Sequence, residues 1–191
     1  MPPGMPKPVG LIGEADALLI LDRHRDFLPD WAMPVPWGGQ LRAQIAGCAR
    51  RFLQSGQPVI WSGDVHLPVG MRLIDWPAVQ RFPADLDTKS ALDQVWLTES
   101  LRRAGVTRIF LCGLALEHDW LWISRDALGQ GFELVLVTDA LVALDAQPGE
   151  VPRAMTVADR EGAQLVKLHE IVRPARAHIA VGPASSFHAL A

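Results

Sequence analysis

The sequence predicts an α/β fold, a three-layer α/β/α sandwich built on a doubly wound, mostly parallel sheet. Short continuous apolar runs alternate along the chain with longer helix-like stretches. Continuous apolar runs are typical of strands covered on both faces, as in parallel sheets. Strands and helices that alternate at this spacing favour right-handed βαβ units. The 191 residues, 49% of them hydrophobic, suffice for one domain with a full core.

Five apolar runs bounded by turn residues are the predicted strands. They are ALLIL at 17–21, PVIWS at 58–62, RIFLC at 108–112, ELVLV at 133–137 and AQLV at 163–166. Four helices are predicted, and several of these stretches end in glycine, the residue preferred just beyond a helix C-terminus. They cover 39–56, 97–105, 117–131 and 150–162. The stretch from Gly63 to about Asp93 shows no period and is predicted to be a long loop of functional importance.

One domain is expected over residues 1–191, with its core at about 16–167. The N-terminal MPPGMPKPVG is rich in Pro and Gly and lacks the apolar region of a signal peptide. Together with the tail from Arg173 onward, it is expected to be loose. No apolar stretch approaches the roughly 20 residues that a membrane span needs, so no membrane partner is expected.

The charge and cysteine content exclude several classes of protein. The formal net charge is −3 and no run of Lys and Arg exceeds two residues, so nucleic acid is not an expected partner. Cys48 falls in a predicted helix and Cys112 in a predicted strand. That placement suits reduced core thiols better than disulfides or a metal site, and it makes a cytoplasmic location the default expectation.

Polar residues gather where the predicted strands end. Asp22 follows the first strand, Asp64 and His66 follow the second, and Asp119 comes shortly after the third. Lys89 lies in the long loop before that third unit. In open α/β sheets, ligands bind beyond the carboxyl ends of the strands. These residues are therefore the candidates for a functional site.

Each candidate also has a purely structural interpretation. An Asp after a strand is often a turn or capping residue. Asp119 in the first helical turn would meet free N–H groups and the positive end of the helix dipole. Lys89 could be a solvated surface lysine, and Asp64 with His66 needs a third ligand to form a metal site. The residue types alone leave the function open.

Four blocks in a fixed order carry a resemblance to a known family. They are DRHRDFLPD, SGDVHLP, Lys89 nine residues before Thr98, and CGLALEHDWLWISRDALGQGFEL. They resemble D-x-Q-x-D-F, T-R-D-x-H-P, a lysine and C-G-[VL]-A-T-[ED]-x-C of the isochorismatase-like or cysteine hydrolase family. That family includes nicotinamidases and N-carbamoylsarcosine amidohydrolases. The resemblance spans about residues 16–167 and implies the isochorismatase-like hydrolase fold.

The resemblance also implies roles for individual residues. Asp22 matches the family's general acid or base, Lys89 matches its triad lysine, and Asp119 stands at the position of the nucleophilic cysteine. Leu114 and Ala115 match the pair that usually forms a cis peptide and helps build the oxyanion hole.

The predicted substrate pocket takes three further residues from the same comparison. His24 stands where the family motif has Gln, Phe27 matches the motif's Phe, and Trp120 adjoins Asp119. Asp64 and His66 match two metal ligands of nicotinamidase-like members. WPAVQ at 76–80 lacks the third histidine, so we expect a degenerate remnant, no metal and no cofactor.

These departures change the expected chemistry. A helix N-terminus keeps a cysteine nucleophilic, whereas a carboxylate there is a weaker nucleophile. Cys112 belongs to a strand and should face the core, so cysteine-dependent amide hydrolysis is not expected. Isochorismate itself is a dianion, and Asp119 would add like charge beside it.

Three functions remain open on the sequence. Asp22, Lys89 and Asp119 could form an acid/base set that activates water against a small neutral or cationic substrate. The chain could instead be a degenerate family member, a pseudoenzyme that binds a small molecule or a partner without turnover. It could also serve as a structural subunit, since the resemblance implies a homodimer or larger homo-oligomer.

Overall fold

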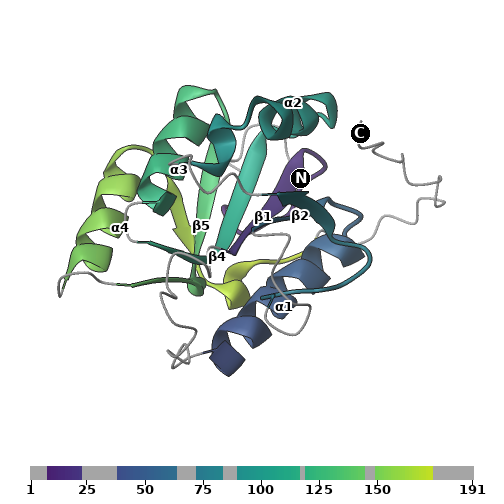
Figure 1. The fold of residues 1–191 in the computed structure, drawn as a ribbon, viewed down its shortest axis with the longest axis horizontal. Helices are drawn as coiled ribbons and strands as arrows, with labels where there is room; N and C mark the ends of the chain where they lie inside the picture. The colour runs from purple at the N-terminus through teal and green to yellow at the C-terminus, as the bar shows by residue number, and fades with distance from the viewer. Residues whose placement is uncertain are drawn as a thin grey trace.

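A computed structural model describes residues 8–22, 38–63, 72–83, 90–116, 119–144 and 149–173. Six strands form one parallel sheet in the order β3-β2-β1-β4-β5-β6 (Figure 1). The order reverses direction between β1 and β4, so the chain winds outward on both sides of this point. The predicted doubly wound α/β class is confirmed, and the reversal marks the carboxyl edge of β1 and β4 as the place for a ligand.

The elements have the following bounds. The strands are β1 Asp16–Asp22, β2 Val59–Gly63, β3 Gln80–Pro83, β4 Arg108–Leu116, β5 Glu133–Leu144 and β6 Gln164–Val166. The helices are α1 Gly38–Gln54, α2 Val95–Arg103, α3 Asp119–Gly129 and α4 Glu150–Arg160, with short 3-10 turns η3 Ala91–Asp93 and η4 Leu168–Glu170.

Both faces of the sheet are covered, which explains the continuous apolar runs. Side chains alternate between the faces along each strand. In β1, Ile20 joins a core cluster with α1, and Leu19 joins a second cluster with α2, α3 and α4. Figure 1 shows the same division, with α1 on one side of the sheet and the other three helices opposite. All seven residues of β1 are buried.

The structure corrects the predicted elements most clearly at β3 and β5. β4 also runs to Leu116, beyond the predicted 108–112. β3, which pairs with β2 alone among the described strands, lies in the stretch predicted to be a loop. It was missed because a four-residue edge strand with alternating half-buried and exposed residues gives no apolar run. β5 extends seven residues beyond the predicted 133–137, since Thr138 and Asp139 lie in an irregular part of the strand. Their side chains bond to Val166 O and Leu168 N, so polar residues that suggested a strand end hold β6 and η4 in place.

The amino edge of the sheet is closed by a buried ion pair. Arg108 Nε and Nη2 donate to the two carboxylate oxygens of Asp16 at 3.0 and 2.6 Å. Arg108 also donates to the carbonyl oxygens of Val9 and Leu11. Within the predicted loose leader, Val9 thus contacts Arg108, and Gly10 O accepts a hydrogen bond from the N–H of Val172. Residues 1–7 and 174–191 lie outside the described residues.

The two cysteines are free and fully buried, as predicted for core thiols. Burial, and then the hydrogen bond with Cys48, raise the pKa of the Cys112 thiol well above its ordinary value. Cys112 therefore stays a neutral core side chain rather than a thiolate nucleophile.

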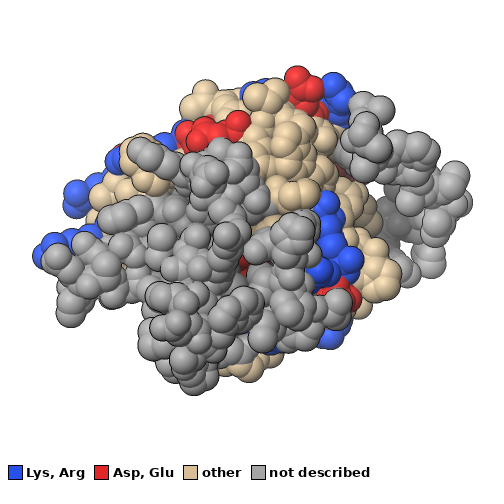
Figure 2. All heavy atoms as spheres, viewed as in Figure 1, with Lys and Arg blue, Asp and Glu red and all other residues tan. Residues whose placement is uncertain are grey.

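The described part of the surface mixes charges of both signs. Figure 2 shows acidic and basic side chains interspersed on one face, without a continuous basic area among the residues described there. Among the described helices, none is both long enough and apolar enough to cross a membrane.

Candidate active site at the carboxyl edge

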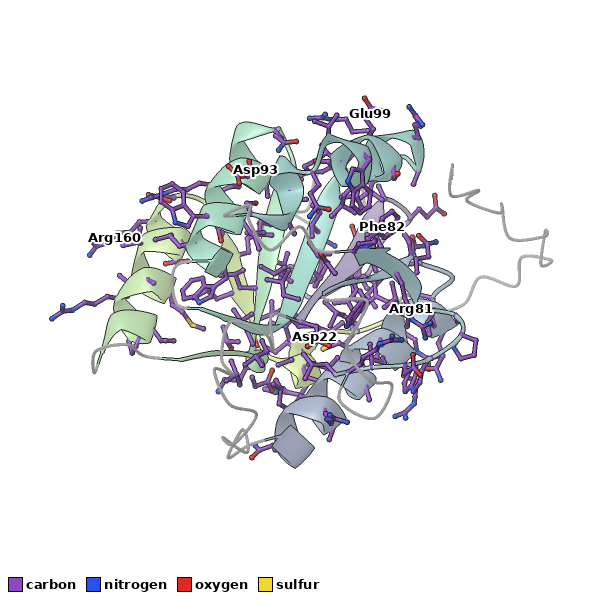
Figure 3. The ribbon with its side chains drawn as sticks, viewed as in Figure 1. Asp22, Arg81, Phe82, Asp93, Glu99 and Arg160 are labelled. Atoms are coloured by element: carbon purple, nitrogen blue, oxygen red, sulfur yellow. The ribbon has the colours of Figure 1, made fainter. Side chains whose placement is uncertain are left out.

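Asp22 is the last residue of the central strand β1 and is fully buried. Its Oδ2 accepts two hydrogen bonds at 2.8 Å, one from Trp61 Nε1 and one from the backbone N–H of Leu73. Both donors come from neighbouring segments on the β2 side of the sheet. The carboxylate is thus fixed in orientation at the edge where the sheet order reverses (Figure 3).

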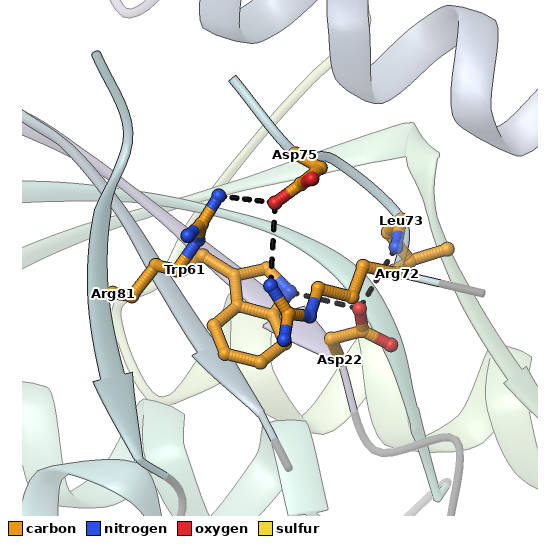
Figure 4. A network of polar contacts seen from close by, with 6 residues as sticks. All are labelled: Asp22, Trp61, Arg72, Leu73, Asp75 and Arg81. Carbon is orange, nitrogen blue, oxygen red and sulfur yellow. Dashed lines mark hydrogen bonds and ion pairs between the residues drawn. The ribbon is translucent and has the colours of Figure 1, made fainter. Parts of the chain in front are cut away.

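An ion-pair network holds the segment that supplies the Leu73 donor. Asp75 Oδ1 accepts from Arg72 at 3.3 Å and also pairs with Arg81 of β3. The Arg72 guanidinium lies over the Trp61 ring, 5.7 Å from its centroid. Figure 4 shows these groups arranged around Asp22. The network links the edge strand β3 to the carboxylate of the central strand.

Gly63 allows Asp22 and Trp61 to approach each other. In the β1–β2 register, Asp22 is paired with Gly63, so Trp61, two residues earlier in β2, lies on the same face. A Cβ at Gly63 would stand 2.5 Å from Trp61 Cζ2 and 2.8 Å from the Asp22 carbonyl oxygen. Any larger residue there would push the indole away from the carboxylate.

β4 brings the next part of the site beside Asp22. The β1–β4 register pairs Asp22 with Leu114. Gly113, at φ +120°, adopts a backbone conformation that favours glycine, and a Cβ there would collide with the Leu21 carbonyl oxygen. This close approach explains why a glycine follows Cys112.

The cis peptide implied for Leu114–Ala115 is absent, because the described residues contain no cis peptide bond. β4 continues as a paired strand through Leu116. Leu114 is buried in the core on the α1 side.

Helix α3 starts at Asp119, three positions after the last residue of β4, so its N-terminus stands at the same edge as Asp22. Trp120 is fully buried in the core on the α2–α3–α4 side. Within the described part of the chain, its Nε1 has no hydrogen-bond partner. Trp122 is 41% exposed, with Arg125 over its ring, so it does not fill the site.

Comparison with known proteins identifies the family. A model of the isochorismatase domain matches residues 16–168. The chain belongs to the isochorismatase family. No curated protein sequence matches it.

Solved structures of the family share the fold. The pyrazinamidase of Pyrococcus horikoshii, solved in complex with zinc, is 26% identical with a TM-score of 0.69, covering 80% of this chain and 99% of its own. The Acinetobacter baumanii nicotinamidase/pyrazinamidase is 18% identical, with a TM-score of 0.66 and coverage of 84% and 99%. The N-carbamoylsarcosine amidase of Thermoplasma acidophilum is 19% identical, with a TM-score of 0.62 and coverage of 80% and 96%.

Several residues that the family resemblance selects lie outside the described residues. These are His24, Phe27, Asp64, His66 and Lys89. For Ala115 and Asp119 the structure describes the backbone only.

Two neighbouring features bear on the lysine and the metal. Ser90, directly after Lys89, is buried and starts η3, whose Ala91 and Leu92 share a core cluster with Trp120. The residue next to Lys89 is therefore anchored in the core beneath α3.

No group of three or more His, Cys, Asp or Glu in the described ranges could hold a metal ion. The absence of a metal at Asp64 and His66 stays a prediction.

The sequence indicates Asp22 as a candidate but does not indicate the groups that contact it. Trp61 lay inside an apolar run and was interpreted as core, and Leu73 lay in the stretch predicted to be irregular. A usable signal did exist. If two parallel strands end level with each other, the side chain two residues before the end of one shares a face with the last residue of its neighbour.

Proposed function

We propose that this member of the isochorismatase family is a small-molecule hydrolase that works without a cysteine nucleophile. Asp22 is the proton-transferring group, and Lys89 and Asp119 complete an acid/base set. The observation that carries the proposal is the placement of Asp22, which is fully buried at the carboxyl edge and oriented by two N–H donors. General acid/base catalysis requires a positioned group of this kind.

Asp119 replaces the nucleophile in this proposal, and its position suits a carboxylate. The N-terminus of α3 favours negative charge through its free N–H groups and dipole. A carboxylate stabilised in this way attacks carbonyl carbon poorly and is better suited to orient water or a positively polarised substrate. Lys89 supplies the positive charge that keeps two carboxylates compatible in one site.

The reaction follows from these roles. A water molecule adds to the carbonyl carbon of a small neutral or cationic substrate while Asp22 takes its proton. Collapse of the tetrahedral intermediate breaks the bond to the leaving group, which receives that proton from Asp22. Water is consumed, and Asp22 returns to its starting state. The amidases to which the chain is similar suggest amides and carbamoyl compounds as the first substrates to test.

The alternative is a family member that binds a small molecule, or forms a homo-oligomeric structural unit, without turnover. One observation favours it: Trp120, predicted to line the pocket, is fully buried in the core. A residue buried in this way leaves less of the α3 side open to a substrate.

A hydrolase screen over amides, carbamoyl compounds and vinyl ethers separates the two functions. We expect turnover by the wild type and by Asp119→Cys, and none by Asp22→Ala. Turnover of amides by Asp119→Cys alone would refute the proposal, because the natural chain would then have lost the ancestral chemistry. Activity of Asp22→Ala equal to the wild type would refute the role of Asp22.

A further inference from the structure

We infer that Trp61 and the backbone N–H of Leu73 form a clamp on Oδ2 of Asp22, and that this clamp fixes the orientation of the carboxylate for proton transfer. Trp61 is thus a positioning residue for the site. The catalytic meaning of the clamp rests on the proposed function, but the clamp itself can be measured without any substrate.

The clamp follows from the hydrogen-bonding capacity of the groups. An indole Nε1–H and a backbone N–H can only donate, and each carboxylate oxygen offers two lone-pair sites. With both donors at 2.8 Å, Oδ2 already accepts two hydrogen bonds. A proton on Oδ2 would have to displace one of them. The two donors therefore hold Oδ2 in one position.

Trp61 is a rigid donor. It lies in β2 between β1 and β3, is fully buried, and belongs to the core cluster on the α1 side. Arg72 covers its ring, and the missing side chain of Gly63 leaves room for the indole beside Asp22. The Nε1–H therefore stays aimed at the carboxylate.

The second donor is rigid for a different reason. Leu73 is buried in the same core cluster, which fixes its side chain. Leu73 lies between Arg72 and Asp75 in the chain, and these two residues form an ion pair. Asp75 also pairs with Arg81 of β3. The charges thus tie the segment from Arg72 to Asp75 to the sheet, and this holds the Leu73 N–H against Oδ2.

Trp120 shows that burial alone does not create such a contact. Its indole is as fully buried as that of Trp61, yet its Nε1 has no partner in the described part of the chain. Replacing either tryptophan by Phe removes the same atoms from a packed core. Only Trp61→Phe also removes a hydrogen bond to Asp22. Trp120→Phe is therefore the matched control for the clamp.

The test uses NMR on the full chain without a ligand. The probes are the side-chain carboxyl carbon of Asp22 and the amide exchange rate of Leu73. We expect Trp61→Phe to move the Asp22 carbon resonance and Trp120→Phe to leave it in place. Asp75→Asn, a change at a partly exposed residue, should speed Leu73 exchange by roughly tenfold because it releases the segment that holds this donor. This second variant covers a failure of Trp61→Phe to fold.

Activity gives a separate result. On a compound that the wild type turns over in the hydrolase screen, Trp61→Phe should lower kcat by about tenfold with little change in KM, since orientation is lost rather than binding. Equal shifts of the Asp22 carbon in Trp61→Phe and Trp120→Phe, or unchanged Leu73 exchange in Asp75→Asn, would overturn the clamp. If both variants give the expected NMR changes but the wild type turns over none of the compounds, the proposed function is overturned and the clamp stands.

Discussion

Strand β1 has a buried carboxylate at each end, and the two are held in different ways. Asp16 at the amino end makes two hydrogen bonds with the guanidinium of Arg108 and accepts a third from the Gly13 N–H. Asp22 at the carboxyl end is oriented by two neutral N–H donors from Trp61 and Leu73. The same strand thus has the ion pair with Arg108 at one end and the clamp from Trp61 and Leu73 at the other.

The different contacts of Asp16 and Asp22 indicate different roles, stability at the amino end of β1 and catalysis at its carboxyl end. At the amino edge, Arg108 joins β4 to β1 and donates to the carbonyl oxygens of Val9 and Leu11. The role of this guanidinium is therefore to stabilise the fold. At the carboxyl edge, two N–H donors orient the Asp22 carboxylate. Proton transfer needs a group that is held in a defined position. The amino edge should therefore be sensitive in stability, and the carboxyl edge in activity.

The largest expected effect on stability is at the amino edge. Arg108→Met leaves the Asp16 carboxylate buried without its guanidinium partner and removes donors from two carbonyl oxygens. Breaking a buried pair in this way costs about 3–5 kcal/mol of unfolding free energy. Urea denaturation measures the loss. Arg125→Met is the control, because the Arg125–Glu161 pair is exposed and the same change there should cost far less.

A loss below about 1 kcal/mol for Arg108→Met would mean that the amino edge does not depend on its ion pair, and the contrast between the two ends would fail.

A smaller loss of stability is expected from Gly63→Ala at the carboxyl edge. The new methyl group would collide with Trp61 and with the backbone of Asp22, and such overpacking costs about 1–3 kcal/mol. The same collision moves the indole away from the carboxylate, so activity should fall as well. Gly56→Ala provides a comparison, since a Cβ there meets no atom within 4 Å, although its φ of +73° adds backbone strain.

Equal unfolding free energies for Gly63→Ala and the wild type would show that β1 and β2 can separate at this point, against the close packing described here.

Asp22→Asn should leave the unfolding free energy nearly unchanged and lower the rate of turnover. Asp22→Asn preserves the shape of the side chain, and its amide oxygen can accept both N–H donors. The unfolding free energy should change by less than about 1 kcal/mol. Turnover should fall by about 10²–10⁴-fold, because an amide cannot carry the proton. Parallel urea denaturation and rate measurements test both parts, and a stable, fully active Asp22→Asn would reject Asp22 as the acid/base group.

The sequence was a good guide to features that buried strands impose. Five strands, four helices and the position of Asp22 followed from apolar runs and the residues that end them. β3 was not predicted, because an edge strand of four residues packs too little surface to require an apolar pattern. The extension of β5 escaped because Thr138 and Asp139 act through contacts with β6 and η4, which are distant in sequence.

The site was harder to predict than the fold for a related reason. A carboxylate at a strand end is visible in the sequence, but the groups that orient it are not. Leu73 contributes a backbone N–H, which every residue except proline has, so its identity carries no signal. Trp61 contributes an indole from a run whose hydrophobicity alone explains its burial. The Asp16–Arg108 pair was missed as well, since its members stand 92 positions apart.

The smallest expected effect concerns an exposed pair that serves as a reference for both ends of β1. The pKa of the Glu161 carboxyl lies below its ordinary value, mainly because Arg125 donates hydrogen bonds to it. A lowered pKa in the folded state gives stability that is present above the ordinary value and is lost as the pH falls through the lowered one. Glu161→Gln should therefore slightly reduce the acid dependence of the unfolding free energy.

High salt should weaken this contribution and leave the buried Asp16–Arg108 contribution largely intact, because screening acts mainly on exposed charges. Equal salt sensitivity of Glu161→Gln and Arg108→Met would show that water reaches the amino edge and that its ion pair is not the closed contact that distinguishes it from Asp22.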